Sequence, residues 1–202
     1  MTIGYTDLLV LVGLICSIVD GHQYHDMSSL RWIYHFNVAA AIPLDCAVTF
    51  AEVAATTGVD ENYSKRMLRH AMTNQLFCEP EPGKVAHTAS SALLVRSKSL
   101  NDWVGYTTEE TFPVSAKVVE AYERFGTSHK PNESAYNIAF NTDKPMFDHL
   151  AEFPDRERRF ANTMAEMTST EGYGIHHLLN GYQWENIDKA TVVDVCRAQD
   201  PT

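Results

Sequence analysis

The sequence lacks the cysteine patterns that mark disulfide frameworks and structural zinc sites. Its four cysteines are widely separated, with no Cys-x-x-Cys pair and no histidine at zinc-finger spacing. Such scattered cysteines are typical of reduced thiols in a cytoplasmic protein. A Gly-x-Ser-x-Gly motif is also missing and no cysteine stands in an evident Cys-His pair, so the sequence indicates no covalent nucleophile.

Positive charge is scarce. Lysine and arginine together number 16 against 26 acidic residues, which gives a formal net charge of −10. Because such a protein is repelled by phosphate backbones and anionic lipids, we expect no nucleic-acid partner and no membrane partner. The apolar stretch from Leu8 to Val19 is shorter than the roughly 20 residues that span a bilayer, and it lacks a basic leader. We interpret it as a buried or dimer-forming helix.

Glycine is absent from the end of the chain, where one fold would require it. Residues Thr191–Val195 form a β-branched run typical of the first strand of a Rossmann sheet. A glycine-rich turn normally follows, because it lets the backbone approach a phosphate or cofactor closely. Residues 196–202 contain no glycine. The sequence therefore predicts one vestigial Rossmann strand and no bound cofactor.

The first hundred residues predict three helices. Apolar residues recur at helical spacing over residues 28–43. Thr49 begins a second helix with a capping box, and Gly58 ends it. Asp60 caps a third helix, for which we expect an inner stripe of Tyr63, Met67 and Ala71.

A β-hairpin is predicted after these helices. Residues 79–83 have the composition of a turn, and residues 84–88 that of a returning strand. Three helices followed by a hairpin are typical of a winged helix-turn-helix unit. The rest of the chain predicts a mainly α fold. Helices are expected over residues 102–125, 134–141 and 156–168, and a further helix is expected to be capped by Asp143 and interrupted by Pro154.

The order of these elements, with several short motifs, resembles the plant-type and fungal small-molecule O-methyltransferases that use S-adenosylmethionine. The resemblance covers the chain from about Gln23 to Val195. The motifs that carry it are Ile33–Asn37, Ala41–Leu44, Leu68–Asn74, Phe77–Pro80, Val85–Thr88, Phe140–Pro145 and Thr191–Val195.

This resemblance implies a domain plan and a homodimer. Residues 1–27 would form an apolar dimerisation helix, 28–98 a winged-helix dimerisation domain, 99–188 a helical connector that floors the substrate pocket, and 189–202 a remnant of the cofactor-binding domain. Within the homodimer, Tyr24 and His25 would reach into the partner's pocket. The family's cofactor and catalytic histidine belong to the C-terminal Rossmann domain, which we expect to be missing here.

A set of aromatic and methionine side chains is the leading candidate for a substrate surface. Flat rings and soft thioethers make adaptable apolar pockets, although such stripes are more often ordinary core. The substrate-binding candidates are Phe112, Phe140, Met146, Phe147, Phe160, Met164 and Met167, together with Tyr24 and His25.

Acid–base candidates come from residues that exchange or donate protons without a cofactor. We predict His176, His149 and Tyr173 for catalysis, while surface or capping roles for the histidines remain the alternative. His35 and His70 are expected to make structural hydrogen bonds. The cluster of His22, His25 and Asp26 has spacing compatible with a metal, but without a fixed scaffold we expect no metal. The basic stripe Lys65, Arg66 and Arg69 suits a DNA-reading helix, which the acidic composition disfavours.

The leading functional hypothesis is a truncated O-methyltransferase-like protein of fungal polyketide-type biosynthesis. Acting without S-adenosylmethionine, it would hold an apolar or aromatic intermediate for cyclisation, isomerisation, dehydration or a pericyclic step, because correct positioning alone lowers such barriers. One alternative is a non-catalytic dimerisation or regulatory partner of an intact O-methyltransferase. Another is a fragment of a full-length O-methyltransferase.

Overall fold

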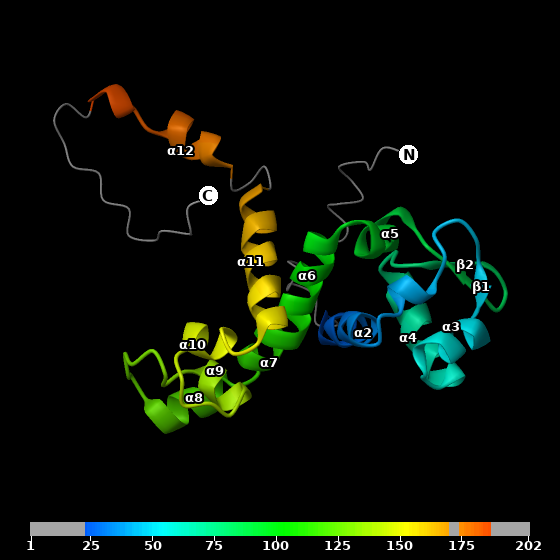
Figure 1. The fold of residues 1–202 in the computed structure, drawn as a ribbon, viewed down its shortest axis with the longest axis horizontal. Helices are drawn as coiled ribbons and strands as arrows, with labels where there is room; N and C mark the ends of the chain where they lie inside the picture. Colours follow the sequence, from blue (N-terminus) through cyan, green and yellow to red (C-terminus); the bar gives the residue numbers. More distant parts are fainter. Residues whose placement is uncertain (1–22, 170–173, 187–202) are drawn as a thin grey trace. The chain divides into compact units, whose positions relative to one another are not determined.

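The computed structural model describes residues 23–169 and 174–186, and Figure 1 shows the fold. The chain divides into two compact units, Met1–Glu166 and Met167–Thr202. The expectations for Leu8–Val19, His22, Tyr173 and Thr191–Val195 lie outside the described residues. Within the described part, no helix combines the length and apolar character needed to cross a membrane.

Helix α2 (Gln23–His35) contributes Leu30 and Ile33 to the core of the first unit. The predicted helix over residues 28–43 is wrong at both ends, because α2 begins earlier and ends at His35. Asn37 has a φ of 51°, in the left-handed region that breaks an α-helix. A short 3₁₀ turn, η1 (Ala39–Ala41), then precedes Pro43.

Helices α3 (Phe50–Thr57) and α4 (Glu61–Thr73) follow the local capping signals. Thr49 and Glu52 form the predicted capping box, and Gly58 ends α3 with a φ of 71°. Asp60 accepts a hydrogen bond from the backbone N–H of Tyr63 and so caps α4. Tyr63 itself is 50% exposed, which contradicts its place on the inner stripe. The buried side chains of α4 are Ser64, Leu68 and Ala71.

A small antiparallel sheet has the strand order β1-β3-β2. Its strands are β1 (Val48–Thr49), β2 (Cys78–Glu81) and β3 (Lys84–Ala86), with Val48 opposite Val85 and Cys78 opposite Ala86. The predicted turn over residues 79–83 is too long, because β2 continues to Glu81 and only the residues around Gly83 turn. Gly83 has a φ of 87°, which favours glycine at this position. β1 has only two residues, which is too short for an alternating pattern that the sequence could reveal.

Four helical segments and a π-helical turn follow the sheet. They are α5 (Ala89–Arg96), α6 (Lys98–Tyr106), the π-helical turn η2 (Thr107–Thr111), α7 (Phe112–Ser115) and α8 (Val118–Phe125). The predicted single helix over residues 102–125 is therefore interrupted, and α5 was not predicted. Pro113 follows the π-turn and has no N–H to continue a regular ladder.

The first unit closes with α9 (Ala135–Ala139), α10 (Met146–Leu150) and most of α11 (Pro154–Ser169). The prediction that Asp143 caps α10 is wrong: Pro145 holds the cap position and no side chain caps the helix. Pro154 begins α11, where a missing N–H costs nothing. The second unit contains α12 (Ile175–Gly181) and the 3₁₀ turn η4 (Trp184–Asn186).

Candidate functional site

The π-helical turn η2 carries two adjacent glutamates. Glu110 is buried, with a side chain that is 4% exposed, whereas the side chain of Glu109 is 17% exposed. π-Helical turns are rare and occur often at functional sites. Here the turn lies between α2 and α11, and its two carboxylates face different partners.

Glu110 is held between two arginines of α11. One oxygen accepts a hydrogen bond from Nη2 of Arg156 at 3.0 Å, and the other accepts one from Nη2 of Arg159 at 2.9 Å. The two arginines are three residues apart and therefore share one face of the helix. Both of their side chains are only 15% exposed. One carboxylate thus compensates two guanidinium groups in a poorly solvated place.

A hydrogen-bond chain leads from Arg156 to a buried histidine. Nη2 of Arg156 donates to the hydroxyl of Tyr136 at 3.1 Å, and that hydroxyl lies 2.8 Å from Nδ1 of His149. Since the tyrosine oxygen already accepts from the arginine, its own proton can donate to a neutral imidazole. Burial raises the pKa of Tyr136, and the charge of Arg156 opposes this rise. The tyrosine is therefore held in its protonated form.

An outer layer connects η2 with α2. Glu109 accepts a hydrogen bond from Nη2 of Arg31 at 3.1 Å and lies 3.2 Å from Nδ1 of His35. The hydroxyl of Tyr34 accepts from Nη1 of Arg159 at 3.3 Å. Tyr34 reaches this position because Gly105 of α6 leaves room for its side chain: a Cβ at that glycine would approach Tyr34 Cε2 to 2.7 Å and the Cζ and hydroxyl oxygen more closely.

These side chains surround a pocket of about 390 Å³. Its apolar wall is Phe140, whose ring lies 4.2 Å below the guanidinium carbon of Arg156. Burial lowers the pKa of Arg159, but its hydrogen bonds to Tyr34 and Glu110 outweigh that effect and leave the pKa raised. The lining residues are Tyr34, His35, Glu109, Phe140, Arg156 and Arg159.

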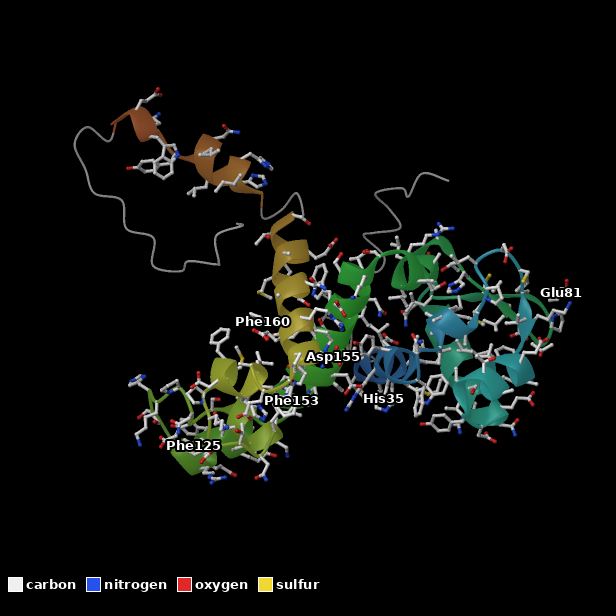
Figure 2. All side chains as sticks on the ribbon, in the orientation of Figure 1. His35, Glu81, Phe125, Phe153, Asp155 and Phe160 are labelled. Carbon is white, nitrogen blue, oxygen red and sulfur yellow. The ribbon has the colours of Figure 1, made fainter. Side chains whose placement is uncertain are left out.

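Helix α11 is fixed against α6 by a second buried acid. Asp102, whose side chain is 4% exposed, accepts hydrogen bonds from Asn162 at 2.6 Å and from Arg158 at 3.4 Å. Figure 2 shows Phe153 and Asp155 at the start of α11 and Phe160 further along the same helix. Phe160 contacts Tyr106 of α6 and Phe147 of α10, with ring centroids 5.5 and 5.6 Å apart.

The predicted substrate residues fall into several places. Phe140 lines the pocket, and Phe147 and Phe160 pack together one helical turn beyond Arg156. The exposed fraction of Phe147 is 64%. Tyr24 and His25 lie on α2 with exposed, neighbouring rings 4.1 Å apart. The half-buried members of the set are Phe112 on α7, Met146 on α10, and Met164 and Met167 on α11.

The predicted catalytic residues are also separated. His149 is 9% exposed and bonds to Tyr136, behind the pocket. His176 lies on α12 of the second unit, exposed, with its ring 4.0 Å from that of His177. The structural hydrogen bonds expected for His35 and His70 are confirmed by their contacts with Glu109 and Asp26. Within the described ranges, no three His, Cys, Asp or Glu side chains gather closely enough to hold a metal ion.

Sequence reasoning missed the charged core of this site. Glu110, Arg156 and Arg159 were not candidates, because charged residues on a helix usually face solvent, and Tyr136 was not a candidate either. The signal that could have indicated them is the spacing of Arg156, Arg159 and Phe160, which places both guanidinium groups beside the predicted aromatic stripe.

Comparison with known proteins finds fungal O-methyltransferases among the relatives of this chain. No protein-family model matches it. It is 39% identical to the O-methyltransferase aurJ of Gibberella zeae over 174 residues, which is 86% of this chain and 40% of that protein. It is 35% identical to the chlorophenol O-methyltransferase of Trichoderma longibrachiatum over 177 residues, or 86% of this chain and 38% of the relative.

Solved structures share the fold at lower sequence identity. OxaC superposes with a TM-score of 0.62 and 19% identity over 71% of this chain and 37% of its own. A protein described as a pericyclic reaction enzyme superposes with a TM-score of 0.58 and 17% identity over 78% of this chain and 42% of its own. The chain spans 40% or less of the length of aurJ and of the chlorophenol enzyme. With 39% identity over most of its own length, the chain is a homologue of fungal O-methyltransferases and corresponds to less than half of such a protein.

Proposed function

We propose that this chain forms the acceptor-binding part of an O-methyltransferase-type protein, and that the pocket beside α11 holds a hydroxylated aromatic molecule. The observation that carries the proposal is the pairing of the Phe140 ring with the guanidinium group of Arg156 in a pocket of about 390 Å³. This volume is within the range of about 300–1,000 Å³ for small-molecule sites. The chlorophenol O-methyltransferase, at 35% identity, is named for a phenolic acceptor.

The family implies S-adenosylmethionine, and the charges of this pocket do not fit it. The reactive sulfonium of that donor is positively charged. Arg156 and Arg159 line the pocket, and Arg31 lies directly behind Glu109. Because like charges repel strongly in a poorly solvated site, the pocket suits the acceptor rather than the donor.

A second candidate function is cofactor-free catalysis on the same ligand. It is favoured by the chain from Arg156 through Tyr136 to His149, because a guanidinium can polarise a carbonyl oxygen while a tyrosine exchanges a proton with an imidazole. Such a set would support cyclisation, isomerisation, dehydration or a pericyclic step. Holding the substrate in a near-attack geometry could add about 7–11 kcal/mol in the most favourable intramolecular reactions.

One experiment separates these functions. The purified 202-residue protein is titrated calorimetrically with hydroxylated aromatic compounds and then incubated with them, with and without S-adenosylmethionine, before mass spectrometry. Binding without turnover supports the acceptor-binding part, whereas isomeric product formed without S-adenosylmethionine supports the second candidate. Phe140→Ala should weaken binding, and Phe125→Ala, a change at another half-buried ring outside this pocket, should not. Failure of every aromatic compound to bind would contradict both functions.

We also propose that residues 28–98 form the winged-helix dimerisation unit. Its support is the order of α2, α3 and α4 before the β2–β3 hairpin, and an exposed aromatic cluster in which Trp32 contacts Phe36 and Tyr63. Sedimentation equilibrium should give a dimer that Tyr63→Glu weakens. Tyr122→Glu, at an exposed tyrosine of α8, is the control. A wild-type protein that sediments as a monomer would contradict the proposal.

A further inference from the structure

The guanidinium group of Arg156 is incompletely used by the protein. Its Nη2 donates to Glu110 and Tyr136, but no acceptor among the described residues meets its Nε or Nη1. Arg159 uses Nη1 and Nη2, and its buried Nε has no partner within the described part of the chain. Because buried arginines normally satisfy most of their five N–H groups, the open donors of Arg156, which lines the pocket, indicate room for an acceptor.

The charges around the pocket do not balance. Arg31, Arg156 and Arg159 face two carboxylates, Glu109 and Glu110, which leaves one positive charge in excess. The excess lies in a chain whose formal net charge is −10. A local cation that is 15% exposed is costly unless an anion approaches it. The site is therefore suited to one negative charge.

The aromatic wall restricts the shape of that anion. Phe140 lies directly below the Arg156 guanidinium, so a planar group that bonds to the free edge of the guanidinium extends over the same ring. The fork of an arginine matches the two oxygens of a carboxylate, and it also donates to a single phenolate oxygen.

The geometry points to a site for one anionic planar group, an aryl carboxylate or an ionised phenol, with its oxygen on the free edge of Arg156 and its ring against Phe140. This assignment rests on the proposed function, since it gives a charge to the aromatic ligand of the same pocket. Glu109 acts against anion binding, because its carboxylate lines the same pocket and lowers the affinity of the pocket for anions.

Calorimetric titration with matched probes tests the assignment. The probes are 2-naphthoate, its neutral analogue 2-naphthamide, and a trichlorophenol titrated above and below its own pKa. We expect naphthoate to bind about 10-fold to 100-fold more tightly than the amide, the range for hydrogen bonds to a charged group. The trichlorophenol should bind more tightly when it is ionised. If only naphthoate or only the phenolate is preferred over its neutral form, that result shows whether the site takes a carboxylate or a phenolate. Equal binding of naphthoate and naphthamide would overturn the charge assignment while leaving the aromatic pocket intact. If neither binds, the proposed function itself fails.

Variants locate the anion on Arg156. Arg156→Gln should remove the preference for naphthoate over naphthamide, and Arg156→Lys should restore part of it. Loss of Arg156 also removes one of the two ion-pair partners of Glu110, which could destabilise the protein. A second variant leaves that pair intact. Glu109→Gln should tighten naphthoate binding roughly twofold to fivefold and leave naphthamide binding unchanged. Arg66→Gln removes an equal charge from the exposed side of α4 and should change neither. A Glu109→Gln protein with unaltered naphthoate affinity would refute the site.

Discussion

Replacement of Glu110 by glutamine tests how much the two-arginine cluster contributes to stability. The carboxylate is 4% exposed, and its oxygens lie 3.0 and 2.9 Å from the Nη2 atoms of Arg156 and Arg159. Glutamine keeps the volume but presents an NH₂ group to one guanidinium and removes the negative charge. Loss of one partner from a buried ion pair costs about 3–5 kcal/mol. Since both arginines retain some contact with water, we expect a loss near the lower end, about 3 kcal/mol.

Urea unfolding followed by far-ultraviolet circular dichroism measures this loss. The transition midpoint should fall while the slope with denaturant stays constant, because the surface exposed on unfolding is nearly the same. Glu120→Gln is the control: it breaks a surface pair with Lys117, whose nitrogen lies 2.7 Å away and whose side chain is 42% exposed. Such surface pairs contribute less than about 1 kcal/mol. If Glu110→Gln costs no more than Glu120→Gln, the arginine cluster does not hold the site together.

Three further changes test other parts of the fold. Gly105→Ala should destabilise the protein by about 1–3 kcal/mol in urea unfolding, because the new methyl overlaps the ring of Tyr34; an unchanged midpoint would show that Tyr34 moves freely. The hydrogen bonds from Arg69 lower the pKa of Glu79 from 4.5 to about 2, so its contribution to stability is complete above pH 4.5 and is lost as the pH falls towards 2. Melting temperatures of wild type and Glu79→Gln should therefore converge across that window, and curves that stay parallel would contradict this. Thr49→Ala should cost about 1 kcal/mol by removing the cap of α3, with Thr49→Ser as the variant that retains stability.

Local sequence signals predicted the elements whose ends are set by short-range chemistry. Thr49, Gly58 and Asp60 delimit α3 and α4 as expected, because a cap needs only a side chain or a left-handed residue at the right spacing. Helix α5 escaped prediction since its capping box pairs Thr88 with Ser91, where a glutamate or glutamine is the usual signal. The ends of α2 also escaped it, because Asn37 adopts a left-handed conformation for which the sequence carries only a weak preference.

The candidate site was predicted only where a single residue type suggested its role. Phe140 and His149 were chosen as an aromatic ring and an imidazole, and the structure places both rings beside Tyr136. The ion pairs join Glu110 to arginines 46 and 49 residues further along the chain. No pattern within one helix encodes such a pairing, since it depends on how α11 packs against α6. A run of arginines and glutamates at the start of α11 is therefore indistinguishable in sequence from a solvated helix face.

The π-helical turn explains how one short segment serves both layers of the site. Successive residues of a helical turn point in different directions, and Glu109 and Glu110 accordingly pair with different elements. Glu109 turns towards Arg31 on α2, and Glu110 turns towards Arg159 on α11. The pocket is lined by Tyr34 and His35 of α2, by Glu109, and by Arg156 and Arg159 of α11 together with Phe140. A shift of η2 by one residue would move both carboxylates off their partners, so the register of this turn fixes which charges pair around the pocket.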